Sequence, residues 1–164
     1  GGGSALDTAA MVGANAQALL AELVTRRGRH EEAERLYTQA LDAYTRHYGT
    51  DHPTTARCMC DLAAVMARRG RTSQGEHMAR RALAAATAAH GEGHPAVAAC
   101  WVALGDNLIA KGDNFEAHSV YRTAYDIIAT ANGQEDEEAL RVDRLISQLD
   151  QELGWGQPEE GNEG

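Results

Sequence analysis

The fold is decided by three turn sequences, Arg27-Gly28-Arg29, Arg69-Gly70-Arg71 and Lys111-Gly112-Asp113, each 42 residues from the next. A second turn keeps the same interval, because Gly49-Thr50-Asp51-His52-Pro53 recurs as Gly91-Glu92-Gly93-His94-Pro95. A fixed period of this length is typical of proteins built from stacked repeats. We therefore predict three copies of one unit, each with two helices joined at a glycine turn.

Apolar residues recur at helical spacing on both sides of these turns, which predicts seven helices. The predicted units are repeats at about residues 8–50, 51–92 and 93–133, a capping helix at 135–153, a linker or cloning scar at 1–7 and a disordered acidic tail at 155–164. The capping helix is expected because the last repeat of a stack otherwise leaves an apolar face in water.

Two local patterns add detail to this plan. The first helix carries an apolar stripe at helical spacing, which we expect to be buried: Leu19, Leu20, Leu23 and Val24. At the start of the fourth helix, Ser73 and Glu76 have the spacing of a capping box, in which each side chain bonds the backbone amide of the other residue.

Composition favours an all-α protein. Hydrophobic residues make up 43% of the 164 residues, but Ala dominates them and only one Phe is present. Strands favour branched and aromatic residues, whereas Ala is the best helix former. Together with the period, this predicts an all-α fold, a right-handed α-solenoid of three helix-turn-helix repeats and a C-terminal capping helix.

The net charge of −9 is concentrated near the C-terminus. Residues 1–132 hold 13 basic and 14 acidic side chains, and residues 133–164 hold 2 and 10. No basic patch stands out, so we expect neither nucleic acid nor a membrane as a partner. No apolar run approaches the roughly 18 residues of a membrane span. The three cysteines are an odd number, which favours a reduced, cytoplasmic protein.

No signature of catalysis or cofactor binding is found in the sequence. It has no Ser-His-Asp order, phosphate-binding loop, GxGxxG or HExxH motif, so we expect no enzyme activity and no cofactor. His52 and His94 lie on successive turns, which helix packing places roughly 10 Å or more apart, too far for one metal ion. The acidic run at residues 135–138 fits the first turn of the capping helix. We expect no metal site.

The repeat resembles the tetratricopeptide repeat. The third copy carries the resemblance most clearly, in Trp101-x-x-Leu104-Gly105-x-x-Leu108 and Ala117-x-x-x-Tyr121-x-x-Ala124. The 42-residue period and the stretch Gly28-Arg29-His30-Glu31-Glu32-Ala33-Glu34-Arg35-Leu36-Tyr37 resemble the long repeats of kinesin light chains more than the ordinary 34-residue form. The resemblance covers roughly residues 8–133.

The resemblance implies a concave groove that is lined by the first helix of each pair and binds extended or helical peptides. Residues of the first helices that lie outside the core stripe are the candidates to face this groove. They are Asn15, Glu22 and Arg26 in the first repeat, Arg57, Cys60, Asp61 and Arg68 in the second, and Val102, Asp106 and Ile109 in the third.

Two binding modes known in such repeats lack their residues here. A clamp for a C-terminal carboxylate needs cationic and amide donors, but the matching places carry Ala18, Glu22, Asp61, Ala99 and Ala103. The asparagine pairs of kinesin light chains are replaced by Ala18-Leu19, Cys60-Asp61 and Val102-Ala103. What remains is an apolar floor with a few charges.

An apolar floor with Glu22, Asp61 and Asp106 suits a basic amphipathic segment, laid in by its apolar face. The alternative, that these are solvated charges and the partner binds elsewhere, stays open at this point. We predict a non-catalytic scaffold or adaptor that binds a protein or peptide. The other options are self-association as a homodimer, through the first or the degenerate second repeat, and a regulatory domain of a larger signalling enzyme or motor complex. The resemblance adds association with the cytoskeleton as an option.

Overall fold

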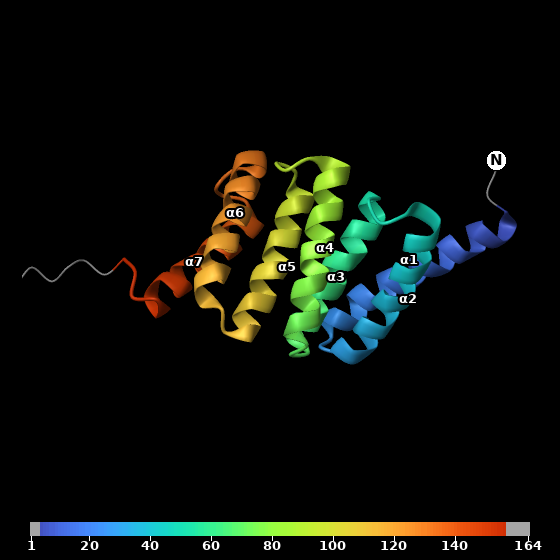
Figure 1. Ribbon diagram of the computed structural model, residues 1–164, viewed down its shortest axis with the longest axis horizontal. Coiled ribbons are helices and arrows are strands. Elements are labelled where there is room, and N and C mark those ends of the chain that lie inside the picture. The colour runs from blue at the N-terminus through green and yellow to red at the C-terminus, as the bar shows by residue number, and fades with distance from the viewer. Residues whose placement is uncertain (1–3, 157–164) are drawn as a thin grey trace, which may run out of the picture.

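The computed structural model describes residues 4–156, and this part of the chain is all-α. Its helices are α1 (Ala5–Arg26), α2 (His30–Tyr48), α3 (Pro53–Arg68), α4 (Thr72–His90), α5 (Pro95–Lys111), α6 (Asn114–Asn132) and α7 (Glu137–Glu152). Figure 1 shows antiparallel pairs that stack side by side along the long axis. The predicted all-α solenoid is confirmed. The expected acidic tail lies, from residue 157 on, outside the described residues.

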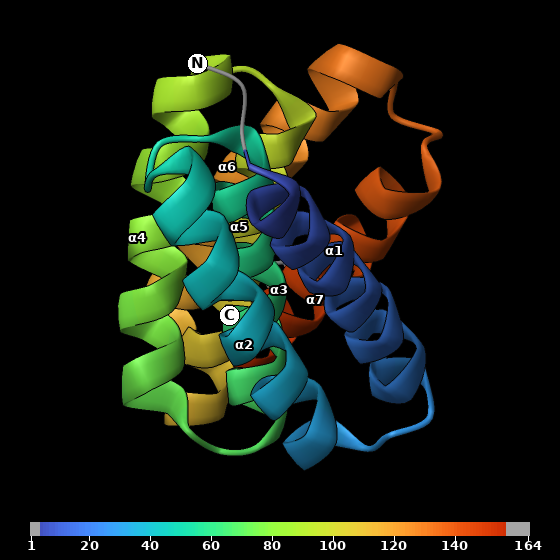
Figure 2. The ribbon, with the colours of Figure 1, turned by 90° about the vertical axis from the view of Figure 1, so that its right-hand side faces the viewer.

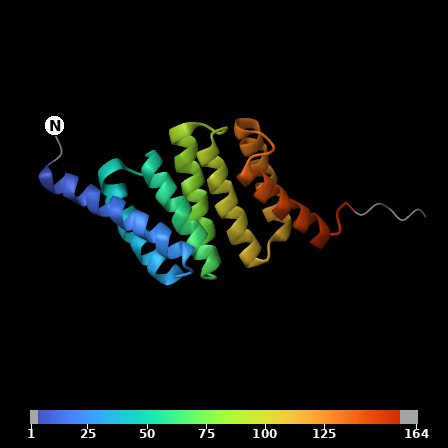
Figure 3. The ribbon, with the colours of Figure 1, turned by 180° about the vertical axis from the view of Figure 1, so that it is seen from behind.

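The pairs form two layers. In Figure 1 the second helices, α2, α4 and α6, lie toward the viewer, and from behind, in Figure 3, α1 and α7 lie in front at the two ends. Each second helix packs against the first helix of the next pair, and α3 also packs on α5. Figure 2 views the N-terminal end of the stack, with α1 and α2 in front. The first-helix layer is therefore where a groove between repeats can form.

The glycine turns require glycine. Gly28, Gly70 and Gly112 have φ angles of +76°, +73° and +95°. Residues with a Cβ rarely adopt this left-handed backbone conformation, because the Cβ crowds the backbone. The 42-residue spacing that organises the sequence is thus the spacing of the points where the chain reverses.

The repeated histidines cap helices. His52 and His94 precede Pro53 and Pro95, and their Nδ1 atoms accept hydrogen bonds from the amides of Thr54 (3.1 Å) and Ala96 (3.0 Å). The first amides of a helix have no partner within the helix, so a side-chain acceptor stabilises the helix start. The histidines of the two equivalent turns therefore cap α3 and α5 in the same way.

Two helix starts differ from the sequence-based expectation. Helix α1 begins at Ala5, before residue 8, because Ser4 and Asp7 form a capping box. The expected capping box of Ser73 and Glu76 is wrong, since no side chain caps α4. The Glu76 carboxylate instead pairs with basic side chains of α4 and α5.

The expected buried stripe of α1 is largely wrong. Leu19, Leu20 and Leu23 are 64%, 45% and 56% exposed, whereas Val24 and Ala21 are buried. Helix α1 turns its small side chains toward α2, where close approach favours them, whereas Leu20 and Leu23 point away and Leu19 lines a cavity between α1 and α3. In the described residues no helix lies over that outer side, as Figure 2 shows.

Successive pairs are joined by carboxylates in the second helices. Glu34 is only 6% exposed. Its carboxylate pairs with Arg69 at 2.7 Å and with Arg71, which both follow the C-terminal end of α3. One repeat later, Glu76 pairs with Lys111 at 3.1 Å. A buried charge requires partners of opposite sign, so this contact fixes the register between neighbouring pairs.

Two glycines inside helices permit close packing. A Cβ built on Gly105 would lie 2.5 Å from the ring of Tyr121, and one built on Gly75 would lie 1.9 Å from Oδ1 of Asn107. Asn107 is fully buried, and its Nδ2 donates to the carbonyls of Ala63 and Ala103, both at 2.9 Å. These helices therefore meet at distances that a side chain on either glycine would not allow.

We expect Gly75→Ala to destabilise the protein, because the new methyl group displaces Asn107 from its two hydrogen bonds. The expected loss is about 1–3 kcal/mol in the free energy of unfolding, measured by urea denaturation. In an Asn107→Ala background the same substitution should cost nothing, or stabilise by up to about 1 kcal/mol, since Ala favours a helix over Gly. Equal effects in both backgrounds would contradict the packing.

Candidate peptide-binding groove

Three cavities follow one another along the layer of first helices. The α1–α3 cavity has a volume of about 340 Å³ and is lined by α1, α2 and α3. The α3–α5 cavity, of about 640 Å³, is lined by α3, α4 and α5. The α5–α7 cavity, of about 340 Å³, is lined by α3, α5, α6 and α7. We call this row of cavities the groove.

The α1–α3 cavity is lined by two acidic side chains. Glu22 of α1 and Asp61 of α3 both line it, with Arg57 as the only basic side chain among its lining residues. Burial raises the pKa of the Asp61 carboxyl to about 6, Arg57 lowers it in part, and the negative charge of Glu22 raises it further. Asp61 is therefore a partly buried carboxylate whose charge is incompletely compensated.

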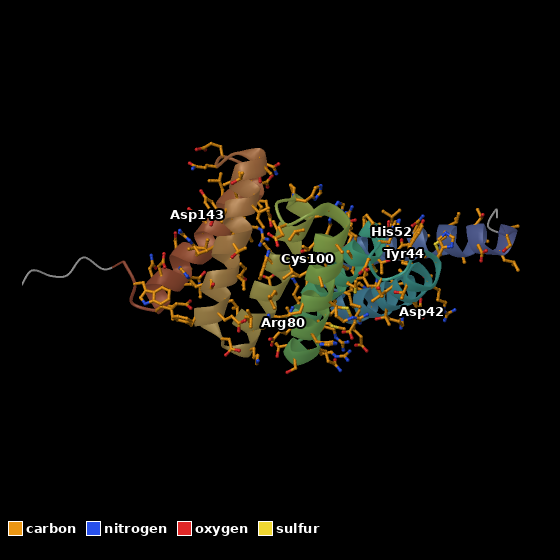
Figure 4. All side chains as sticks on the ribbon, turned by 45° about the horizontal axis from the view of Figure 1, so that its top comes forward. Asp42, Tyr44, His52, Arg80, Cys100 and Asp143 are labelled. Atoms are coloured by element: carbon orange, nitrogen blue, oxygen red, sulfur yellow. The ribbon has the colours of Figure 1, made fainter. Side chains whose placement is uncertain are left out.

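Two tyrosines of α2 complete this cavity. The Oη of Tyr44, a residue labelled in Figure 4, donates a 2.7 Å hydrogen bond to Oδ1 of Asn15. Burial and the charge of Asp61 raise the pKa of Tyr37 above its ordinary value, so its hydroxyl stays neutral. The α2 tyrosines therefore present aromatic surface and neutral hydroxyls to the groove.

The α3–α5 cavity contains two thiols beside charged groups. Cys60 and Cys100 line it together with Arg57 and Asp61, and both cysteines are free and buried. A hydrogen bond with Cys100 and burial raise the pKa of the Cys60 thiol well above its usual value. Nucleophilic attack requires the thiolate, so Cys60 is a neutral wall residue and an unsuitable nucleophile.

The α5–α7 cavity is lined by Asp106 as well as by a glutamate of α7. Tyr121 Oη donates a 2.6 Å hydrogen bond to Oδ1 of Asp106. Burial raises the pKa of Asp106, while this hydrogen bond and the nearby Arg141 and Arg68 lower it. Asp106 is thus better compensated than Asp61.

The structure brings eight of the predicted groove residues to these cavities: Asn15, Glu22, Arg57, Cys60, Asp61, Arg68, Asp106 and Ile109. Arg26 lies outside them, exposed, where it pairs with Glu22 at 2.8 Å. Val102 is a wrong assignment, because it lines none of the three cavities and packs within the core.

The sequence pattern does not predict several of the lining residues. Tyr37, Tyr44 and Tyr121 reach the groove from second helices, although that layer was not expected to contribute. Tyr37 and Tyr121 occupy the same repeat position, which is a usable signal. Arg141 comes from α7, which was considered only as a cap, and no sequence pattern connects it to a cavity.

Other kinds of site find no support in residues 4–156. No three His, Cys, Asp or Glu side chains in this range are arranged to hold a metal ion. Within the same range, every helix is too short or too polar to cross a membrane.

A family model described as a tetratricopeptide repeat matches residues 14–88 and, in a second placement, residues 61–129. The two placements overlap and together cover well over half of the chain. No curated protein sequence matches this chain.

Solved structures share the fold at low sequence identity. BtubC (BKLC) from P. vanneervenii is 22% identical with a TM-score of 0.76, over 86% of this chain and 56% of that one. A putative kinesin light chain from Podosopora anserina, with nearly identical TPR-like repeats, is 20% identical with a TM-score of 0.76, over 85% of this chain and 66% of that one. The Sgt2 TPR domain from Aspergillus fumigatus is 16% identical, with a TM-score of 0.62, over 92% and 89%. This chain therefore spans only part of the first two.

We expect the charge of Asp61 to make stability pH-dependent. Its folded pKa of about 6 lies above the ordinary value of 3.8, so the folded state holds the extra proton between these values and stability falls as the pH rises through this window. Asp61→Asn should therefore raise the free energy of unfolding by on the order of 1–2 kcal/mol at pH 7.5, with the gain vanishing near pH 4.

Urea denaturation at pH 4 to 7.5 measures this difference. Asp143→Asn is the matched control, because Asp143 is an exposed aspartate of α7, labelled in Figure 4. A gain for Asp61→Asn that is the same at every pH would show that the carboxylate is not held in a disfavoured charged state.

Proposed function

Because the chain belongs to the tetratricopeptide repeat family, we propose that it is a non-catalytic scaffold or adaptor that binds a basic amphipathic segment in its groove. Tetratricopeptide repeats are generally protein-interaction modules. The proposal of a basic ligand rests on a row of carboxylates. Glu22, Asp61 and Asp106 each line one or more of the three cavities.

The charge state of Asp61 favours a cationic ligand. A partly buried carboxylate with a raised pKa is stabilised by a nearby cation, which replaces the water that burial removed. Arg57 is the one lysine or arginine that lines the two cavities at Asp61, and it shares the α1–α3 cavity with Glu22 as well. A lysine or arginine of the ligand therefore supplies the missing positive charge.

The remaining walls suit an apolar helix face. Small and aliphatic side chains separate the carboxylates: Ala18, Leu19, Ala64, Ala67, Ala99 and Ile109. Side chains this small leave room for the bulky residues of a helix, as in helix-in-groove recognition. The ligand we propose thus has leucine-like residues on one face and basic residues along its edges.

The proposed setting is the reducing interior of the cell. The three cysteines are free and buried, which fits a compartment where thiols persist. A regulatory role within a larger signalling enzyme or motor complex would use the same groove. The sequence that adjoins this module in its gene distinguishes the two roles, since a nucleotide-binding motif would favour regulation.

We expect charge reversal in the groove to abolish binding of a basic peptide. The probe is a fluorescent amphipathic peptide of lysine, leucine and alanine, with a glutamate-for-lysine twin as the negative control. Asp61→Lys with Asp106→Lys should weaken its binding at least tenfold, about 1.4 kcal/mol or more, because attraction becomes repulsion. Fluorescence anisotropy measures the affinity.

The matched control is Asp42→Lys with Asp143→Lys, which changes the net charge equally on exposed aspartates of α2 and α7, both labelled in Figure 4. Circular dichroism checks that both variants keep their helicity. If the two double variants weaken binding equally, the attraction is a general charge effect and the groove is not the site.

Binding of the same peptide should weaken as the pH falls through 6. Asp61 then takes up a proton and loses its attraction for lysine, which stays charged in this range. We expect the affinity of the wild-type protein to fall between pH 7.5 and 5, and that of Asp61→Asn to be lower and nearly constant. A parallel decline in both proteins would assign the pH dependence to other groups.

A further inference from the structure

Helix α1 carries an exposed apolar seam on its outer side. Six residues recur at alternating intervals of three and four, and no charged residue stands among them: Leu6, Ala9, Gly13, Ala16, Leu20 and Leu23. All six are exposed, and Leu6 reaches 81%. This alternation is the pattern of a helix that packs lengthwise on another helix.

The later repeats bury the same positions. Gly13, Ala16, Leu20 and Leu23 correspond, 42 residues on, to Thr55, Cys58, Leu62 and Val65 of α3, none of which is more than 4% exposed. The matching positions 97, 100, 104 and 107 of α5 are exposed by 1% or less. In both cases the covering elements include the second helix of the preceding pair, because α2 packs on α3 and α4 packs on α5. Cys58 Sγ, for example, donates to the carbonyl of Tyr37 in α2. The seam of α1 is therefore a helix-packing surface that no described residue covers.

We propose that this seam binds the seam of a second copy of the chain, with the two α1 helices antiparallel. The seam has large residues toward its ends and small ones in the middle. An antiparallel pair centred between Gly13 and Ala16 sets Ala9 against Leu20 of the other copy and Leu6 against its Leu23. Gly13 opposite Ala16 permits close approach of the two helices at the centre, and the leucines then contact one another or an alanine on either side of it.

The shape of the N-terminal end of the solenoid supports this pairing of two α1 helices. The N-terminal part of α1 extends beyond α2 in Figures 1 and 3, and residues 5–10 are all exposed. In an antiparallel dimer each extending part lies over Leu20 and Leu23 of the other copy. Both poorly covered halves of the seam are then buried by one two-fold contact.

Charge favours this head-to-head arrangement over stacking head to tail. Residues 133–156, which hold 7 acidic and 2 basic side chains, lie at the other end of the stack, where α7 exposes a mainly polar side. The largest exposed apolar side chain of α7 is Leu140, at 39%. A two-fold contact at α1 keeps the two acidic ends far apart, so repulsion is small and the assembly closes as a dimer.

Sedimentation equilibrium over a range of concentrations tests the proposal. We expect the wild-type chain to form a dimer, and Leu20→Lys with Leu23→Lys to raise the dissociation constant at least about a hundredfold, since four leucines per dimer lose their burial. Leu140→Lys is the matched control on α7 and should leave the dimer intact. The groove variants should also leave it intact, because they lie on another face.

Gly13→Leu distinguishes specific helix packing from nonspecific hydrophobic association. A Cβ at Gly13 meets nothing within 4 Å, so the substitution fits the monomer. The substitution should weaken the dimer, because the larger side chain blocks the close approach of the two helices. Nonspecific hydrophobic association would instead become stronger, since the substitution adds apolar surface. A chain that is monomeric at every concentration overturns the proposal, as does a dimer that resists both sets of substitutions. A monomer that binds a peptide of residues 30–48 also overturns it, and assigns the seam to a further repeat helix.

Discussion

The structure depends on the close approach of helices at residues that have little or no side chain. Ala21, Ala63 and Gly105 occupy one repeat position on the first helices, and at Gly105 a single added carbon would overlap the ring of Tyr121. Because the ring fits there, the Tyr121 hydroxyl reaches across to Asp106 and becomes part of the groove. The same small residues that bring the two helices of a pair together therefore also place aromatic side chains beside the carboxylates.

Two carboxylates of the solenoid, Glu34 and Asp61, have different roles. Glu34 is buried between α2 and α3 with two arginines, so its charge is compensated and it holds neighbouring pairs in register. Asp61 faces the groove with a raised pKa and only partial compensation from Arg57. Burial of such a group costs stability in the free protein, and that cost is relieved when a cation binds. Stability and recognition are thus linked through one side chain.

The repeat period made the order of helices and the positions of their turns predictable, because glycine turns and apolar spacing are local properties. Features that depend on neighbours were not predictable. The apolar stripe of α1 predicts buried leucines that are in fact exposed, because the stripe alone does not say which side another helix covers. Val102 was placed in the groove, yet a modest rotation about the helix axis separates it from the cavity that Asp106 lines. Arg141 joins that cavity only because α7 packs back on α6, which no local pattern encodes.

The most direct test of the groove as a recognition site is an NMR titration of the isotope-labelled chain with the lysine–leucine–alanine peptide. We expect backbone amide shifts to change along α1, α3 and α5, most strongly near Glu22, Asp61 and Asp106, while amides near the exposed Asp42 stay unmoved. Changes confined to the outer sides of α2, α4 and α6, or spread evenly over the surface, would contradict the proposal that the groove binds a basic segment.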